Sequence, residues 1–360
     1  MNDGPLYFPR QALALALLAN LQAGITNAFT LFAPRRMGKT QFLQKDIAPA
    51  AQEVGFNVFY FSFMDEREGL SQAQYFHERL LLFAQSLRAG GNLKRFWGNV
   101  HKVEVFGVGL EREARREMLS ISEVISLIAQ NDKPTLLLLD EVQELGRLPQ
   151  MEGLIRSLRT GLDIHQRQVK TLFTGSSQNG LRKMFNDIKA PFFHFSHALD
   201  FPTLGKAFSD FLADIYQSRT HQMLDKEAFW QAFKRLNQTP MYLRAMVQDM
   251  IINPSLTLEV ALEQKLALMN EHADFPRLWQ TLSMAERFIL QALTQGKTGL
   301  YTKAFREELA SALGVEEMTA SAVQGNVRKL MNKEIISQNA TNHWQLNNGL
   351  LEIWIKEQTL

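Results

Sequence analysis

The sequence contains no cysteine, which excludes disulfides, thiolate nucleophiles, iron–sulfur clusters and cysteine-type zinc sites. It also lacks an excess of charge of one sign, because 39 lysines and arginines stand against 37 aspartates and glutamates, a net charge of +2. Such a balance is not the bulk signature of a nucleic-acid binder. No apolar run approaches the ~20 residues that a membrane-spanning helix needs. We therefore expect a protein of the reducing cytoplasm without a membrane segment.

One stretch near the start imitates a targeting signal. Residues 12–19 read ALALALLA just after Arg10, but the charged flank is thin and no cleavage site follows. We predict a buried helix here instead. The rest of the composition is typical of a globular protein: 46% of the 360 residues are hydrophobic, and the length suits two or three domains.

The first 200 residues alternate short apolar runs with helical patterns. The apolar runs predict four strands, at residues 28–33, 56–64, 135–139 and 170–175. Because nearly every residue in these runs is apolar, we expect strands buried on both faces of a parallel sheet with crossover helices. Helical windows lie near 40–54, 71–90, 120–131 and 148–160, and residues 101–110 predict a hairpin or β-ribbon.

The pattern changes after Pro202. Residues 203–275 are helical almost throughout, with turn signals at 237–240 and 253–254. The last part has helical windows near 283–294, 302–313 and 319–332, then short strand patterns at 335–337 and 343–346 around a polar turn. Three helices followed by a two-stranded hairpin is the order of a winged helix-turn-helix. We therefore predict three domains, at 1–202, 203–275 and 276–360.

The sharpest local pattern is Ala33-Pro34-Arg35-Arg36-Met37-Gly38-Lys39-Thr40. It follows the first predicted strand and leads into a predicted helix, and Gln41, the next residue, is a further candidate for nucleotide binding. It matches the phosphate-binding pattern G-x-x-x-x-G-K-[ST] except for alanine at the first position. In this pattern backbone N–H groups surround the β-phosphate, Lys39 reaches the β- and γ-phosphates, and the Thr40 hydroxyl binds Mg²⁺. The alternative is a chance GKT before an amphipathic helix. A second motif downstream favours nucleotide binding.

That second motif is an apolar strand, residues 136–139, ending in Asp140 and Glu141. Asp140 would hold Mg²⁺ through water, and Glu141 would polarise the water that attacks the γ-phosphate. Read alone, the pair is a solvated acidic turn after a core strand. Beside the phosphate loop it favours an ATPase over a small-molecule kinase. The sequence has no N-K-x-D guanine signature, so ATP is preferred over GTP.

Several segments resemble one family in the same order along the chain. APRRMGKTQFL resembles the GPRRxGKTxLL loop of the archaeal-type P-loop ATPases, which lie near the AAA+ and STAND groups. Further similar segments are LLLLDEVQEL (136–145), TLFTGSS (171–177), TPMYL (239–243) and residues 326–355. The resemblance implies an α/β, parallel-sheet core of the ASCE/AAA+-like type, a helical lid and a C-terminal winged helix. It also implies ATP with Mg²⁺ as ligand, and ATP hydrolysis.

The resemblance also implies roles for single residues. Ser176, at the end of the sensor strand, would detect the γ-phosphate or the attacking water, although it could be a plain strand-end serine. Arg244 falls on a lid helix where a second sensor can stand, with a solvated arginine as the alternative. Arg36 is shared with the family loop, and its role is open.

Two departures from the family pattern stand out. The family often has Gly-Arg before its last core strand, whereas residues 190–195 contain no arginine. Arg182 and Lys183, on the helix after the sensor strand, are the substitutes we consider for an arginine finger, with Arg182 preferred. The lid of the family usually has Gly-Gly before its proline, and here the pair is Asn237 and Gln238.

Nucleic-acid binding is left open by the sequence. The last domain has nine basic and eight acidic residues, and its turn at 338–342 has no basic residue. The candidate DNA contacts lie on the predicted helix 319–332 and are Gln324, Asn326, Arg328 and Lys329. Packing within the protein is the competing role for this helix. Residues 101–116 are a second basic feature. We expect no metal besides Mg²⁺, because His194 and His197 on a strand would point to opposite faces.

Three functions remain in view. The first is a nucleotide-driven switch that hydrolyses ATP and acts on a protein or DNA client. The second is a DNA-loading ATPase like the replication-initiator or transposition-regulator branches of AAA+, which predicts DNA-stimulated oligomers. The third is a non-hydrolysing, nucleotide-bound scaffold. The client and the oligomeric state are open, self-association included.

Overall fold

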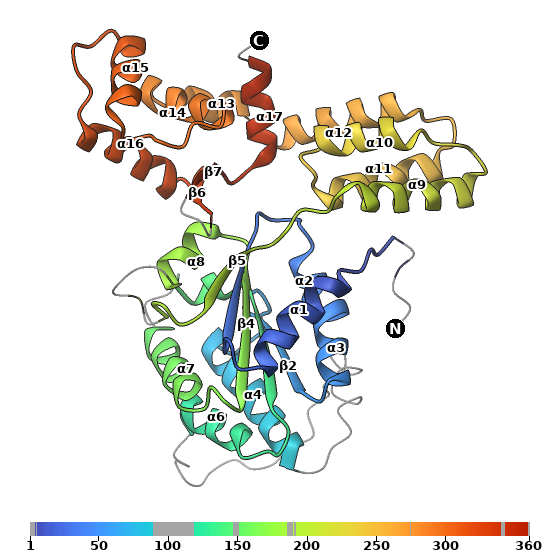
Figure 1. Cartoon of the computed structure of the whole chain (residues 1–360), viewed down its shortest axis with the longest axis vertical. Helices are drawn as coiled ribbons and strands as arrows, with labels where there is room; N and C mark the ends of the chain where they lie inside the picture. Colours follow the sequence, from blue (N-terminus) through green and yellow to red (C-terminus); the bar gives the residue numbers. More distant parts are fainter. Residues whose placement is uncertain are drawn as a thin grey trace.

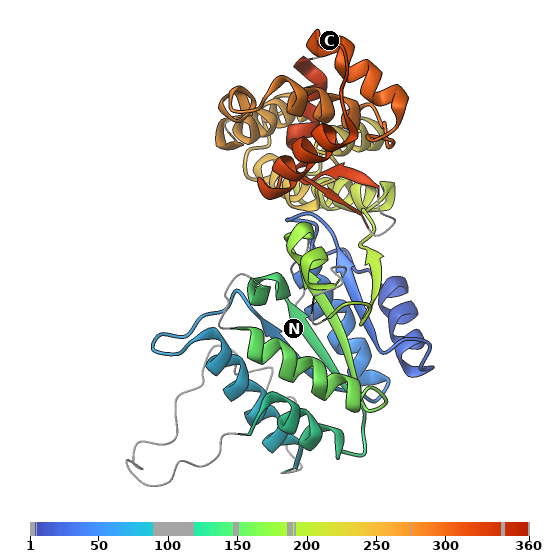
Figure 2. The ribbon, with the colours of Figure 1, turned by 90° about the vertical axis from the view of Figure 1, so that its left-hand side faces the viewer.

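The computed structural model describes residue 4 and residues 6–88, 119–146, 151–185, 190, 192–273, 275–339 and 343–358. They form an α/β part below two helical lobes (Figure 1). A view turned by 90° shows both lobes above the same end of the sheet (Figure 2). The predicted ribbon at 101–110 and most of the turn at 338–342 lie outside the described residues.

Five parallel strands form the sheet, in the order β2-β3-β4-β1-β5. Their bounds are Ala28–Phe32 for β1, Asn57–Ser62 for β2, Thr135–Asp140 for β3, Val169–Gly175 for β4 and His197–Asp200 for β5. The four predicted strands are confirmed. The fifth, β5, has no continuous apolar run, because this edge strand has only four residues and is partly exposed, and the sequence indicated it only as the strand expected to carry His194 and His197.

Helices cover both faces of the sheet. One face is covered by α1 (Gln11–Gln22), α2 (Lys39–Gln41), the π-helix η1 (Phe42–Ile47) and α3 (Ala48–Glu53). The other carries α4 (Gln72–Arg88), α6 (Ile121–Ala129), the 3₁₀ helix η2 (Val142–Gly146), α7 (Glu152–Ile164) and α8 (Gln178–Phe185). Along β3, Leu136 and Leu138 enter the first core, and Leu137 and Leu139 enter the second. The expectation of strands buried on both faces is confirmed.

Two helices differ from their prediction. The stretch predicted as buried, α1, is buried on one face only, since Leu17 and Leu18 are enclosed while Leu15 is 55% exposed. The helix after the phosphate loop contains a π-helical turn, η1, just before Pro49. Proline has no N–H to continue the regular ladder, and a local π adjustment is one way to accommodate it.

The chain from 203 onward is helical and has two separate cores. The first is built by α9 (Lys206–Thr220), α10 (Lys226–Arg235), α11 (Pro240–Ile252) and α12 (Leu258–Ala273). Leu6 and Phe8 from the N-terminal segment also pack against this core. The first helical lobe is therefore completed by residues from the start of the chain.

The second lobe begins with α13 (Phe275–Gln280), α14 (Met284–Thr294), α15 (Lys303–Leu313) and α16 (Ala320–Asn332). The antiparallel hairpin of β6 (Ile336–Gln338) and β7 (Trp344–Leu346) follows, then α17 (Gly349–Gln358). The helix–helix–helix–hairpin order agrees with the prediction, and α17 is an addition. None of the helices in the described ranges combines the length and apolar character of a bilayer span.

Candidate nucleotide site

The loop after β1 has the backbone of a phosphate cradle. Gly38 has φ of 89° and caps α2, and Arg36 has φ of 70°. Glycine adopts this left-handed conformation without steric cost, whereas arginine is strained by about 1–2 kcal/mol. Such strain persists only where the surrounding structure enforces it, and it clusters at functional sites.

Lys39 is folded into this loop. Its Nζ donates to the backbone carbonyls of Ala33 and Pro34, both at 2.8 Å, and the residue is only 6% exposed. Burial lowers the pKa of Lys39 to about 8, although Glu141 and Asp140 oppose the shift. In the described structure the ammonium has two neutral acceptors as hydrogen-bond partners, which suits a site for an anion.

Asp140 ends β3 at the edge where the parallel strands have their carboxyl ends. It is 1% exposed and accepts hydrogen bonds from Thr40 Oγ1 at 2.6 Å, from Tyr60 OH at 3.2 Å and from Thr174 Oγ1. Burial, with the nearby Asp140 charge, raises the pKa of Tyr60. A hydroxyl and a carboxylate that converge in this way are the oxygen donors that Mg²⁺ prefers, so these residues fit the ion.

Glu141 follows at once and has φ of 56°, so its side chain is aimed by a strained backbone. Its Oε2 accepts from Ser176 Oγ at 2.7 Å, from Ser176 N at 3.0 Å and from Gln143 Nε2 at 2.5 Å. Burial alone would raise the pKa of Glu141, but the hydrogen bonds from Gln143 and Ser176 outweigh it and hold the pKa below its usual value. The carboxylate is therefore fixed in its ionised form.

Side chains of α11 contact the phosphate loop and α2. Arg244 Nη1 donates to Gln41 Oε1 at 2.7 Å, and Arg36 donates to the hydroxyl of Tyr242. Burial lowers the pKa of Arg244, which nevertheless remains a cation. A cavity of about 520 Å³ lies here, lined by Leu6, Tyr7, Arg36, Gly38, Gln41, Lys45, Met241 and Arg244 among others. Arg244 thus faces a cleft beside the phosphate loop.

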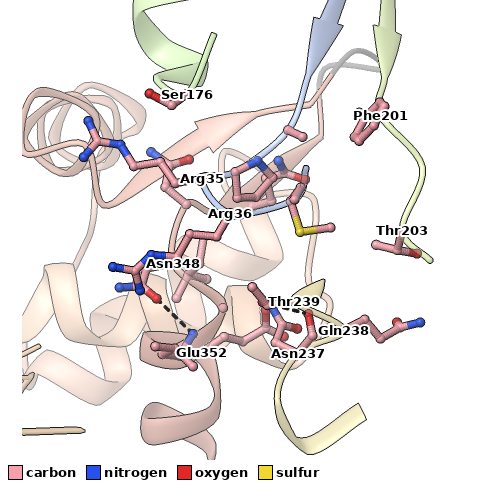
Figure 3. Close-up of a pocket in the computed structure, with 18 of the residues that line it drawn as sticks. Arg35, Arg36, Ser176, Phe201, Thr203, Asn237, Gln238, Thr239, Asn348 and Glu352 are labelled. Atoms are coloured by element: carbon pink, nitrogen blue, oxygen red, sulfur yellow. Dashed lines mark hydrogen bonds between the residues drawn. The ribbon is translucent and has the colours of Figure 1, made fainter. Parts of the chain in front are cut away.

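A larger cavity, of about 920 Å³, lies on the other side of the loop (Figure 3). It is bounded by Arg35, by Ser176, by the α10–α11 turn and by Asn348 and Glu352 at the start of α17. The structure thus brings the end of β4 and the second helical lobe to the outer face of the phosphate loop.

The α10–α11 turn explains the departure from Gly-Gly at residues 237 and 238. Asn237 and Gln238 have φ of 51° and 47°. Two consecutive left-handed residues are the conformation that a Gly-Gly pair adopts most easily. Asparagine tolerates this region better than most residues, whereas glutamine is strained there. The backbone shape is therefore present without the glycines.

Other residues singled out from the sequence lie farther away. Arg182, on α8, donates from Nε to the Gln338 carbonyl of β6 at 2.7 Å. On α16, Gln324, Arg328 and Lys329 are exposed, whereas Asn326 donates to the Ala322 carbonyl of its own helix. Arg182 is thus engaged by the hairpin of the same chain.

The histidine pair is corrected by the structure. His194 lies in a turn with φ of 53°, and only His197 is on a strand, where it opens β5. The expectation that both lie on one strand is wrong, because β5 begins only at His197. Within the described parts of the chain, no cluster of three or more histidine, aspartate or glutamate side chains is arranged to hold a metal ion.

Comparison with known proteins is informative at the level of structure. No family model and no curated protein matches the chain. A Walker-type ATPase of Pyrococcus abyssi superposes with a TM-score of 0.61 at 16% identity, over 97% of this chain and 96% of that one. The ORC2 protein of Aeropyrum pernix in its ADP form gives 0.52 at 15% identity, over 98% and 96%. The chain shares the fold of these two proteins.

This result confirms the α/β fold class and agrees with the resemblance to archaeal-type P-loop ATPases. The structure also reveals site residues that the sequence did not single out: Tyr60, Thr174, Gln143 and Arg10, whose guanidinium donates to the Met37 carbonyl of the phosphate loop at 3.3 Å. Gln143 and Thr174 lie inside the recognised motifs, but no pattern marked them. Tyr60 and Thr174 reach Asp140 from neighbouring strands, and Gln143 reaches Glu141 from the 3₁₀ helix that follows β3.

Proposed function

We propose that the protein binds ATP with Mg²⁺ at this site, hydrolyses it, and acts as a nucleotide-driven switch on a protein or DNA client. The observation that carries the proposal is a convergence of five side chains. Lys39 and Thr40 begin α2 after the loop that follows β1, Asp140 is the last residue of β3 with Glu141 directly after it, and Ser176 directly follows β4. Thr40 contacts Asp140, and Ser176 contacts Glu141, so the groups form one continuous cluster.

Each group has a distinct part in phosphoryl transfer to water. Lys39 exchanges its two carbonyl acceptors for the oxygens of the β- and γ-phosphates. Thr40 and Asp140 would hold Mg²⁺, which would supply charge neutralisation during the transfer. Glu141 orients the attacking water from a fixed position, and Ser176 lies where the γ-phosphate can be detected. Such chemistry needs positioning and charge, and no covalent intermediate.

The smaller cavity is our candidate for the adenosine. Its volume of about 520 Å³ is in the range of ligand pockets, and apolar side chains share it with the cation of Arg244. A nucleotide in this place would touch the core, the N-terminal segment and α11 together. Because ATP and ADP differ in contacts to Glu141 and Ser176, hydrolysis would bias how the lobes sit on the core.

We propose that three parts move relative to one another: 1–202 as ATPase core, 203–275 as lid and 276–360 as winged helix. The hydrophobic cores support this division, because the sheet and the two helical lobes have separate cores, although Leu6 and Phe8 of the first part pack into the core of the second. The order of α14, α15, α16 and the hairpin supports the winged-helix assignment.

ATP turnover of the wild type and of Glu141→Gln tests the proposal, with Lys39→Ala as the binding control. We expect the wild type to hydrolyse ATP, Glu141→Gln to bind ATP with turnover lowered about 100-fold or more, and Lys39→Ala to lose nucleotide binding. Binding without turnover in the wild type would support the scaffold instead. Normal ATP binding by Lys39→Ala would refute the assigned site.

A DNA-loading ATPase is the second candidate. It is supported by α16, whose exposed Arg328 and Lys329 lie in a stretch, residues 318–333, without an acidic side chain. The same turnover assay with duplex DNA, together with the mass in solution, separates the two. Stimulation by DNA with assembly would favour loading, and turnover indifferent to DNA would favour a protein client.

A further inference from the structure

Gln143 is a buried polar residue that the chemistry proposed above does not use. It lies on η2, two residues after Glu141, and is 2% exposed. Burying a side-chain amide is costly unless hydrogen bonds replace its contacts with water. We therefore expect the Gln143 amide to bind specific partners in the interior.

Two glycines make room for this side chain. A Cβ at Gly175, the last residue of β4, would lie 2.1 Å from Gln143 Oε1. A Cβ at Gly180, on α8, would lie 2.7 Å from Gln143 Cβ. Neither glycine has a positive φ, so the backbone conformation does not require glycine. The close approach of the Gln143 side chain is what requires glycine at both positions. β4 and α8 therefore both leave space for this side chain.

The amide is directed at the proposed base. Gln143 Nε2 donates to Glu141 Oε2 at 2.5 Å and to Glu144 Oε1 at 3.2 Å. The two donors of Ser176 end on the same Oε2. No bond to Glu141 Oε1 occurs among the residues that the structure describes. Three donors thus anchor one carboxylate oxygen and leave the other for a water molecule.

We propose that Gln143 is a positioning residue for Glu141, which fixes the carboxylate so that its second oxygen meets the attacking water. This inference rests on the proposed hydrolysis. Ser176 contributes two of the three bonds, but the proposed γ-phosphate contact draws on the same hydroxyl. Gln143 contacts only protein groups in this cluster, so it holds Glu141 in place while Ser176 engages the nucleotide.

Gln143→Met separates positioning from packing, because methionine keeps the volume in the glycine cradle and removes the donor. We expect kcat for ATP to fall about 10- to 100-fold, since a small misplacement of a reacting group has effects of that size. KM and the dissociation constant for ATP should stay within about threefold. Gln168→Met is the matched control, because that amide also donates a hydrogen bond, to the Asn131 carbonyl, at the opposite end of the sheet.

If Gln143 only fills space, Gln143→Met should leave kcat unchanged. That result would overturn the inference while leaving the proposed hydrolysis intact. If Gln143→Met does not fold, Gly180→Ala decides, because the added Cβ displaces Gln143 from the other side. A lowered kcat with normal ATP binding then supports the inference, and wild-type kcat refutes it. A wild type without turnover would remove the proposed hydrolysis, and this inference with it.

Discussion

Single residues hold Asp140 in place from neighbouring strands. Thr174 on β4 is fully buried and donates to Asp140 Oδ1, while Tyr60 on β2 donates to Oδ2. A buried carboxylate needs such partners, because an unpaired charge in the interior is strongly unfavourable. The hydroxyls thus orient one member of the proposed Mg²⁺ pair.

Thr174→Val tests this arrangement with little change of shape. We expect the free energy of unfolding to fall by about 1–3 kcal/mol, since a bond to a charged group is lost. Mg²⁺-dependent ATP binding should weaken as well. Thr171→Val is the control, because the Thr171 hydroxyl is buried on the same strand and no partner for it is found among the described residues. Equal effects of the two substitutions in denaturant titrations would contradict the assigned role.

The sequence predicts the groups that we propose face the nucleotide, and not the residues that hold those groups in place. Lys39, Thr40, Asp140 and Glu141 stand in patterns whose spacing along the chain is fixed by the chemistry. Tyr60 and Thr174 reach Asp140 only because β2 and β4 flank β3 in the sheet. That order is a tertiary property, so no local pattern can reveal these contacts.

At the scale of elements, residues 6–10 form a strap between the core and the first helical lobe. Phe8 stacks edge-on against Phe208 and Phe211 of α9, with ring centres 5.7 and 5.4 Å apart. Its neighbour Tyr7 donates to Asp46 Oδ2 of η1 at 2.5 Å. Adjacent side chains therefore contact different parts of the molecule.

Arg10 extends the strap to the phosphate loop. It donates to the carbonyl of Met37 at 3.3 Å and to that of Pro202, and its guanidinium lies 4.1 Å from the centre of the Phe201 ring. The predicted domain boundary at residue 202 places residues 6–10 entirely in the first domain, although they also contact the first helical lobe. An extended segment of five residues shows no helical or strand periodicity. The sequence alone therefore does not indicate that Leu6 and Phe8 pack against the first helical lobe while Tyr7 contacts η1.

Phe8→Ala should detach the strap from the lobe and leave its core end in place. We expect a loss of roughly 2 kcal/mol and faster amide hydrogen exchange in α9, because two aromatic contacts disappear. Exchange in β1 and β4 should not change. Tyr7→Phe is the comparison, since it removes only the contact with Asp46. Unaltered exchange in α9 would show that the strap does not support this lobe.

At the scale of the whole molecule, α8 joins the core to the second helical lobe. Asn179 Nδ2 donates to the carbonyls of Ile336 at 2.8 Å and Met331 at 3.1 Å, and Ser177 Oγ donates to Glu334 at 2.9 Å. Figure 1 shows this helix directly below the β6–β7 hairpin. Ser177 follows the proposed sensor Ser176, so the site and the docking contact are adjacent in the chain.

This adjacency predicts that the docking of the second lobe responds to local change on α8. Asn179→Ala removes two bonds to the β6 region, so we expect a larger radius of gyration by small-angle scattering and faster exchange in β6. Lys183→Ala, on the exposed side of the same helix, should leave both unchanged. In the Glu141→Gln variant, with no other substitution, bound ATP should alter amide hydrogen exchange in β6, because Ser176 then contacts phosphate. Identical scattering and exchange in all these samples would mean that the lobe is fixed on the core and that the nucleotide acts elsewhere.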